Sequence, residues 1–376
     1  MSVVERETET GAPAAPARIW EEDLVLPTYL VGAPARNADL FTSGWQRIYP
    51  YTLCDDLLYR RQEVTYRAVY LENEYLRVIV LPQLGGHLYS AYDKLAGQEM
   101  FHRNHVIKPG RIRLRGNWCA YGIEFNFPRG HSVTSAAPVD YRLLTHADGS
   151  VAVAVGDCEQ MSRMRWTVIV GLRPNVRRVE VTVRLTNRTG LPHRYYYWAN
   201  ASVSANEHVQ FLSPARAARR FGEDLPFPYE DGLDKRWYKN HFHGTDLFTV
   251  DCPYDFFGYY DHGRDFGVVH VADRHILPGK KFFTWGCGED GLAWATLLSD
   301  NDGPYIEIQA GSHETQADLG LFDPHASLTW QECWYPVWKL GAFDFATEKV
   351  ALHLEPAGAT DAPRALVRLE ATEPVR

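Results

Sequence analysis

Short β-rich runs separated by turn residues dominate the sequence from about residue 64 onward, and this rhythm limits the fold more than any other feature. Pairs of such runs face each other across turn residues: 65–71 with 75–81, 141–145 with 151–155, 165–172 with 178–185, 292–298 with 305–309, and 350–354 with 365–369. The second pair flanks Asp148-Gly149, a strong hairpin signal. Helical periodicity is almost absent, so the series predicts an all-β, antiparallel fold.

The composition agrees with this fold and excludes several classes of function. Of 376 residues, 45% are hydrophobic, 23% are charged and 13% are aromatic, as in ordinary globular proteins that contain many strands. The formal net charge is −8 and no basic block is present, which argues against nucleic acid as a partner. No apolar run approaches the ~18 residues that a membrane span needs. We therefore expect neither a nucleic-acid nor a membrane partner.

The N-terminal residues and the cysteines favour a cytoplasmic protein. Residues 1–18 are acidic and rich in Ala and Pro, without the apolar segment of a signal peptide, and predict a disordered leader. The six cysteines lie far apart and form no CxxC pair. This spacing is typical of reduced, buried thiols.

The strand series predicts one large domain rather than several. No Ser/Gly-rich linker interrupts residues 61–345, so we expect one β-rich domain there, with 19–60 as an arm and 346–376 as terminal strands packed on its core. Residues 214–247 break the rhythm with a long aromatic and charged segment. We interpret this segment as a specificity element over a ligand cleft. The alternative is a surface loop that packs a satellite core or forms an oligomer contact.

Four glutamates stand in otherwise apolar or aromatic strand-like text: Glu124, Glu207, Glu307 and Glu332. Burying a carboxylate costs several kcal/mol unless it is paired or hydrogen-bonded, so such positions suggest a function. The structural alternative is that each lies on the solvated face of its strand.

Two of these glutamates share a strand face with an amide. Glu124 and Asn126 alternate with Ile123 and Phe125, and Glu307 and Gln309 form a second acid and amide pair of the same spacing. Two such strands could place a pair of carboxylates beside hydrogen-bonding groups for sugar hydroxyls, as glycoside hydrolysis requires.

Histidines and tryptophans supply further candidates. His131 follows the Glu124 strand, while His241 and His243 alternate around one residue without a third metal ligand at suitable spacing. We therefore expect no metal, and no cofactor, since phosphate-loop and dinucleotide motifs are missing. Tryptophans are more often core residues, but together they suit stacking on sugar rings: Trp118, Trp198, Trp237, Trp285 and Trp334.

Long motifs in the sequence resemble a bacterial family called domain of unknown function 5107. The motifs include YGIEFNFP followed by GHS, YYYWANASV, YKNHFHGTDLF, GPYIEIQAG and ECWYP, and they extend over most of residues 64–340. Members of this family resemble the galactose-mutarotase-like superfamily. The resemblance implies a β-supersandwich with a sugar site on a concave sheet face.

The superfamily also implies roles for particular residues. It contains aldose 1-epimerases, which use a Glu base and a His acid, and GPYIEIQAG resembles the strand that carries the base, here Glu307. The segment WANAS resembles the strand that carries the acid, but Asn200 stands at that place. Glu124 stands where epimerases have a second His. A set of carboxylates favours cleavage of glycosidic bonds over epimerisation.

We therefore predict a carbohydrate-active enzyme, foremost a glycoside hydrolase acting on a sugar or oligosaccharide through Glu124 and Glu307, with Glu207 or Glu332 as a substitute for either. The alternatives are an aldose 1-epimerase, with Glu307 paired to His131 or His241, and a non-catalytic carbohydrate-binding protein. A homo-oligomer is possible. The first reading requires the polar residues Glu124, Asn126, Asn200, Glu207, Glu307 and Gln309 to converge on one cleft, with His131, His241 and Trp334 at its rim.

Overall fold

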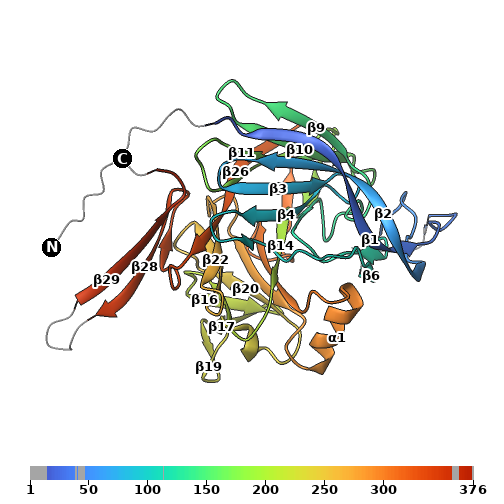
Figure 1. Cartoon of the computed structure of the whole chain (residues 1–376). Coiled ribbons are helices and arrows are strands. Elements are labelled where there is room, and N and C mark those ends of the chain that lie inside the picture. Colours follow the sequence, from blue (N-terminus) through green and yellow to red (C-terminus); the bar gives the residue numbers. More distant parts are fainter. Residues whose placement is uncertain (1–14, 39, 41–46, 113, 358–363, 375–376) are drawn as a thin grey trace.

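A computed structural model describes residues 15–38, 40, 47–112, 114–357 and 364–374 (Figure 1). In this part of the chain, strands predominate and the only α-helix is α1 (Glu289–Leu298). The strands pair in antiparallel ladders within each sheet. The predicted all-β, antiparallel fold class is thereby confirmed.

The first sheet supplies the surface on which the candidate site lies. Within the described residues it has 12 strands. They follow one another in the order β1 (Arg18–Val31), β2 (Leu57–Glu72), β3 (Leu76–Leu81), β4 (His87–Asp93), β8 (Ile123–Asn126), β14 (Trp198–Ser204), β24 (Tyr305–Gly311), β23 (Gly279–Thr284), β20 (Thr245–Val250), β16 (Ala217–Arg220) and β17 (Glu223–Pro226), with β5 (Gln98–Glu99) on β4.

The second sheet packs against the first. Its eight described strands run in the order β15 (Val209–Leu212), β21 (Phe256–Asp261), β22 (Phe266–Ala272), β26 (Ser327–Trp338), β12 (Val179–Asn187), β11 (Met164–Leu172), β10 (Val151–Cys158) and β9 (Asp140–Thr145). Smaller pairs flank the two sheets: β6 (Gly110–Arg111) with β7 (Asn117–Trp118), β13 (His193–Tyr195) with β25 (Gly320–Phe322), and β18 (Tyr229–Glu230) with β19 (Leu233–Asp234).

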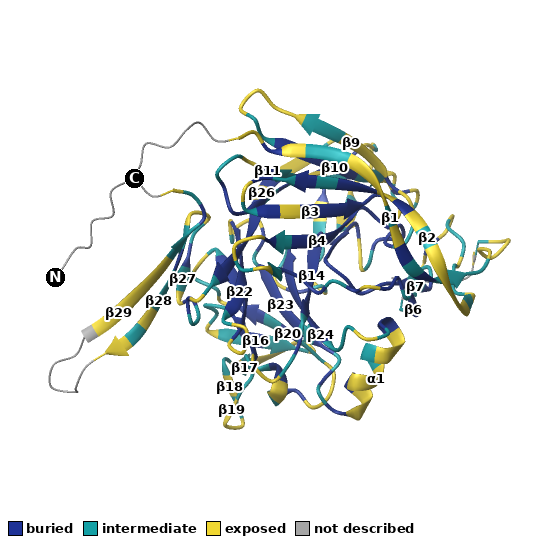
Figure 2. Ribbon diagram, in the orientation of Figure 1, coloured by how far each residue is buried: buried dark blue, intermediate teal, exposed yellow. Residues whose placement is uncertain are grey.

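The main core lies between the two sheets. In β11 every second residue is buried, as in a strand that presents one face to a core. Val168 and Val183 of the second sheet belong to the same buried cluster as Ile123 and Ile308 of the first. The strands β8 and β24 are buried on both faces, since their other faces carry the candidate site. Figure 2 shows this band of buried residues through the sandwich.

Most of the predicted hairpins are present. The ladders β2–β3, β9–β10 and β11–β12 pair the runs that the turn residues predicted. The prediction of a strand over 292–298 is wrong, because these residues form most of α1. Ala and Leu favour a helix, and Glu289 and Asp290 in its first turn interact favourably with the helix dipole.

The C-terminal strands form a sheet of their own. It consists of β27 (Phe345–Ala346), β28 (Val350–Ala357) and β29 (Arg364–Ala371), and the β28–β29 hairpin predicted from the sequence is confirmed. Ala346 and Ala351 at its base are buried in a second core cluster. Farther along the hairpin, Leu354 and Leu369 are exposed, and the two strands extend away from the sandwich (Figures 1 and 2).

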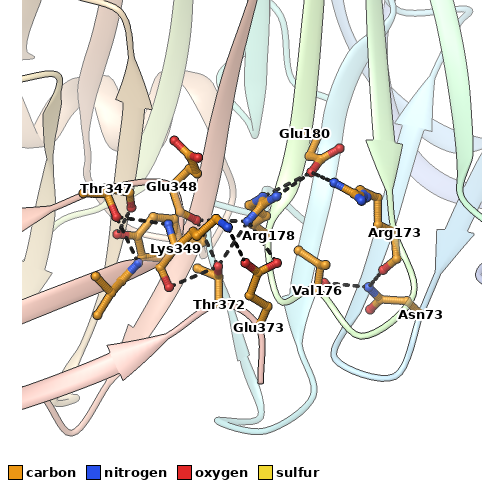
Figure 3. Close-up of polar contacts among 12 residues, drawn as sticks. Asn73, Arg173, Val176, Arg178, Glu180, Thr347, Glu348, Lys349, Thr372 and Glu373 are labelled. Atoms are coloured by element: carbon orange, nitrogen blue, oxygen red, sulfur yellow. Dashed lines mark hydrogen bonds and ion pairs between the residues drawn. The ribbon is translucent and has the colours of Figure 1, made fainter. Parts of the chain in front are cut away.

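Arginine contacts anchor the base of this C-terminal sheet to the sandwich (Figure 3). Arg178, next to β12, donates hydrogen bonds to the carbonyl of Glu348 at 3.1 Å and to the hydroxyl of Thr372 at 3.3 Å. The same guanidinium binds Glu180 at 2.9 Å. Because Arg178 and Thr372 are buried, these contacts fix the sheet at its base.

The predicted division of the chain remains a prediction. Residues 1–14 of the expected leader lie outside the described residues, and β1 begins at Arg18 and pairs with β2 along its length. Among the described helices, none is long and apolar enough to cross a bilayer.

Candidate active site

The candidate site lies on the face of the first sheet that points away from the main core. Glu124 of β8 lies opposite Asn200 of β14, which in turn lies opposite Gln309 of β24, and Lys281 of β23 follows. Residues opposite each other in an antiparallel pair share a face, so the register places these side chains in one polar row. Glu307 lies two residues from Gln309 and therefore points to the same face.

A cavity of about 480 Å³ opens over this row. Its size is within the range of small-molecule sites. Polar and aromatic side chains line it together: Arg129, His131, Asp246, Lys281, Glu307 and Gln309, with Trp118, Tyr196, Trp198, Phe283 and Trp285. Aromatic surfaces beside convergent hydrogen-bonding groups suit a ligand with both apolar faces and hydroxyl groups.

Glu124 lies beneath this cavity and binds four donors. Its Oε2 accepts hydrogen bonds from Nδ1 of His131 at 2.8 Å and from Nδ2 of Asn200 at 3.4 Å. Its Oε1 accepts hydrogen bonds from Nε1 of Trp118 at 3.2 Å and from Oγ of Ser135 at 2.5 Å. The two oxygens of a carboxylate offer about four acceptor positions, so this carboxylate is fully occupied by protein groups.

The contact between Glu124 and His131 sets the charge of both side chains. Burial opposes ionisation of Glu124, but His131 and the hydrogen bonds outweigh it and lower the pKa of this carboxyl group. Burial also opposes the charged imidazole, but Glu124 outweighs burial and raises the pKa of His131. Since Nδ1 of His131 is bound to Glu124, Nε2 is the ring nitrogen left for a ligand in the cavity.

Glu307 lines the cavity, and its pKa is shifted in the opposite direction to that of Glu124. Its Oε2 accepts a hydrogen bond from Nε2 of Gln309 at 2.7 Å, and its Oε1 accepts one from the Tyr305 hydroxyl at 3.4 Å. Burial raises the pKa of Glu307 to about 7, against the opposing effects of His131 and Lys281. A carboxyl group that titrates near neutral pH is suited to accept and return a proton.

Lys281 and Asp246 form an ion pair on the other side of Glu307. The Lys281 ammonium also lies 4.9 Å from the ring centroid of Phe248 and 5.6 Å from that of Phe283. The Lys281 side chain is almost fully buried, whereas that of Asp246 remains partly accessible. The pair therefore offers a fixed donor and an acceptor to the same ligand.

The aromatic wall is held in place by a hydrogen bond and a stacking contact. Trp198 donates from Nε1 to the carbonyl of Gly130 at 3.0 Å. Trp285 stacks on Trp294 of α1 with ring centroids 4.1 Å apart. Helix α1 thus braces one side of the cavity.

One glycine of β24 makes room for another part of this wall. A Cβ at Gly311 would lie 2.0 Å from the hydroxyl oxygen of Tyr196. Only glycine therefore lets the Tyr196 ring approach β24 this closely.

A family model described as a domain of unknown function, DUF5107, matches residues 44–337. The chain belongs to this family. The family predicted from the sequence motifs is thereby confirmed.

Solved structures share the architecture of this DUF5107 chain. A TPR-domain-containing protein from Parabacteroides distasonis is similar with a TM-score of 0.78 and 26% sequence identity over 86% of this chain, which spans 56% of that protein. A galactose mutarotase-like protein from Clostridium acetobutylicum has a TM-score of 0.54 at 10% identity, over 73% of this chain and 96% of that one. A galactose mutarotase-like protein from Lactobacillus casei has a TM-score of 0.50 at 9% identity, over 72% and 100%. The last two likenesses confirm the predicted galactose-mutarotase-like β-sandwich fold.

The structure brings together only part of the residue set that the DUF5107 sequence suggested. Glu307, Gln309, His131 and Trp198 line the cavity. Glu124 and Asn200 lie directly below them, in contact with each other. Trp118 and Trp285, considered from the sequence as stacking platforms, also line the cavity.

Asn126 lies on the same face and shapes the loop that carries His131. Its Oδ1 accepts a hydrogen bond from the backbone N–H of Ser132 at 2.7 Å. Asn126 is fully buried, so its contribution is to position the loop.

The expectation that Glu207 and Glu332 join the site is wrong. Glu207 follows the end of β14, and its side chain is 74% exposed, beside His208. Glu332 lies in β26 of the second sheet, and its side chain points into the core, where it binds His270 at 2.9 Å. Trp334, two residues later on the same face, is also a core residue. Three of the four glutamates, Glu124, Glu307 and Glu332, are buried, but the sequence does not distinguish the sheet to which each belongs.

The histidines and tryptophan of the 214–247 segment also lie away from the cavity lining. His241 is buried and contacts the carbonyl of Lys235 through Nε2 at 2.8 Å, whereas His243 is exposed, so the two do not share a strand face. Trp237 stacks on His262 with centroids 5.0 Å apart. Only Asp246, near the end of the segment, lines the cavity.

Several residues of the site were not predicted from the sequence. Lys281 and Phe283 alternate with Trp285 in GKKFFTWG, and this alternation is the signal that could have identified the first two. Asp246 and Arg129 carry no comparable local signal, because strand register and a loop bring them to the cavity.

No group of three or more His, Cys, Asp or Glu side chains within the described residues has the arrangement of a metal site.

Proposed function

We propose that this chain interconverts the α and β anomers of an aldose, as an aldose 1-epimerase, with Glu307 as the general base and His131 as the general acid. The observation that carries the proposal is the arrangement of these two groups. Glu124 holds His131 by Nδ1, and the cavity contains both His131 and the Glu307 carboxyl group. The fold shared with galactose mutarotase-like proteins supports the same reaction.

The reaction needs two proton transfers, which these residues can provide. Glu307 removes the proton from the hydroxyl group on C1 while Nε2 of His131 donates a proton to the ring oxygen. The bond between C1 and the ring oxygen breaks, and C1 becomes an aldehyde. Rotation about the bond between C1 and C2 presents the other face of the carbonyl. On ring closure, the hydroxyl group derived from the ring oxygen attacks C1 and gives its proton back to Nε2 of His131, while Glu307 returns its proton to the C1 oxygen.

The raised pKa of His131 and the pKa of about 7 for Glu307 suit these roles. The upward shift of the His131 pKa favours the protonated imidazole that the acid role requires, and near pH 7 a substantial fraction of Glu307 is ionised and can accept a proton. The Glu307 pKa of about 7 lies near neutral pH, where a general base is most effective.

Glycoside hydrolysis, the first reading of the sequence, has less support from the site. That reaction needs two carboxyl groups that reach the substrate. Glu124 is occupied by four protein donors, and Asp246 is paired with Lys281. Glu307 is therefore the carboxyl group of the described cavity lining that has neither a cation bound to it nor all its acceptor positions filled.

A screen of freshly dissolved aldoses by polarimetry tests the proposal, with released reducing sugar from aryl glycosides and oligosaccharides measured in parallel. We expect the protein to accelerate the decay of optical rotation, and Glu307→Gln to lose about 100-fold or more of this activity. Release of reducing sugar that depends on Glu307 would instead establish hydrolysis. Saturable sugar binding in calorimetry, without either activity, would make the chain a carbohydrate-binding protein.

A further inference from the structure

Three cationic side chains line the cavity, and one of them has no anionic partner among the described residues. The charged side chains of the described lining are Arg129, His131 and Lys281 against Asp246 and Glu307. Glu124 lies beneath the lining and pairs with His131, so the cation that matters is the one left over after pairing. A cation without a partner at a cavity attracts an anionic ligand.

Ion pairing accounts for two of these cations but not for the third. His131 binds Glu124, and Lys281 binds Asp246. Arg129 makes no hydrogen bond or ion pair with any described residue, and it is exposed at the cavity. A guanidinium offers five N–H donors in a planar fork and has no acceptor of its own.

The backbone on both sides of Arg129 is fixed. The carbonyl of Pro128 accepts a hydrogen bond from the backbone N–H of Tyr196 at 2.7 Å, and the carbonyl of Gly130 accepts one from Trp198 at 3.0 Å. Both donors belong to residues that line the cavity. The loop therefore holds the start of the Arg129 side chain at a set place beside the cavity, which lowers the entropy lost when it binds a ligand.

We propose that the aldose bound in this cavity carries an anionic group, a carboxylate or a phosphate, that the Arg129 guanidinium binds. This inference rests on the proposed function for the reacting end of the sugar, which lies between His131 and Glu307. Both anions match the two-pronged geometry of a guanidinium. A neutral aldose would leave the Arg129 charge at the cavity uncompensated.

Calorimetry in the Glu307→Gln background tests the inference without turnover. The ligands are D-glucose, D-glucuronate and D-glucose 6-phosphate. We expect one or both anionic sugars to bind about tenfold or more tightly than glucose, as one charge-assisted two-pronged contact predicts. The tighter of the two identifies the anion. Addition of Arg129→Ala should abolish the preference, and Arg129→Lys should retain part of it.

Arg142→Ala is the matched control, because Arg142 is an exposed arginine of β9 that does not line the cavity. This variant should keep the full preference. Equal affinity for neutral and anionic sugars, or a preference that survives Arg129→Ala, overturns the inference.

Polarimetry of the wild-type protein separates this inference from the proposed function. Faster anomer exchange of glucose than of either anionic sugar overturns the inference and leaves the epimerase proposal standing. Arg129-dependent binding of anionic sugars without anomer exchange supports the anion site and refutes the epimerase proposal.

Discussion

Replacing Glu124 by Gln removes the charge that holds His131 in its protonated form while nearly preserving the shape of the side chain. Hydrogen bonds to charged groups contribute roughly 1.5–3 kcal/mol. The His131 contact is short, at 2.8 Å, and lies below the cavity, where Glu124 is 2% exposed. Loss of 1.5–3 kcal/mol lowers the pKa of His131, and at pH values above its pKa the protonated fraction of His131 falls about 10- to 150-fold. We expect the rate of anomer exchange at neutral pH to fall by about 10- to 100-fold.

The pH dependence of the rate distinguishes this effect from a general loss of structure. Glu124 raises the pKa of His131, so its removal lowers that pKa and the optimum of the rate shifts to lower pH. Polarimetry across pH 5–9 measures the shift, and NMR titration of the His131 imidazole measures its cause.

Glu332→Gln is the matched control, since it makes the same change in the buried pair with His270, outside the cavity. An unshifted optimum in folded Glu124→Gln, or an equal shift in Glu332→Gln, would refute the reasoning.

Other substitutions test separate parts of the structure. The pKa of Glu307 rises from 4.5 to about 7 on folding, so folding stability is lost as the pH rises through this interval. Glu307→Gln should therefore raise the free energy of unfolding, measured in urea titrations, by up to about 3 kcal/mol at pH 8 but not at pH 4. Trp237→Ala should leave anomer exchange unchanged, because this ring stacks on His262 outside the cavity, and should lower stability by about 1–3 kcal/mol, less than for a fully buried tryptophan. A raised KM with an unchanged melting temperature would instead support the 214–247 segment as a specificity element over the cavity. Gly311→Ala should push Tyr196 into the cavity and raise KM several-fold in steady-state assays, and an unchanged KM would show that the wall adapts elsewhere.

The fold could be predicted from the sequence because its signals are local. Asp148-Gly149 and the alternation of β11 each determine a hairpin or a buried face within a few residues. The segment over 292–298 is apolar enough to suit a strand or a helix; the acidic first turn and the packing of Trp294 on Trp285 accompany the helix that forms.

The site could be predicted only in part, because its geometry depends on register between distant strands. The alternation around Glu124 and Glu307 correctly places each with its amide on one face. The difference between their roles arises from hydrogen-bond donors that the sequence scatters, such as Trp118 and Ser135 on Glu124. Glu332 has equally suggestive neighbours, yet its strand lies in the other sheet.

Exchange NMR of an aldose at anomeric equilibrium tests the central claim most directly, because it measures conversion between the anomers without any net reaction. The sugar that the polarimetric screen identifies as the best substrate is mixed with catalytic amounts of wild-type protein, Glu307→Gln or His131→Asn. We predict exchange cross-peaks between the two anomeric protons with the wild-type protein, and a loss of at least about 100-fold in exchange rate with either variant. Exchange that persists at the wild-type rate in both folded variants would contradict the assignment of Glu307 and His131 as the base and the acid.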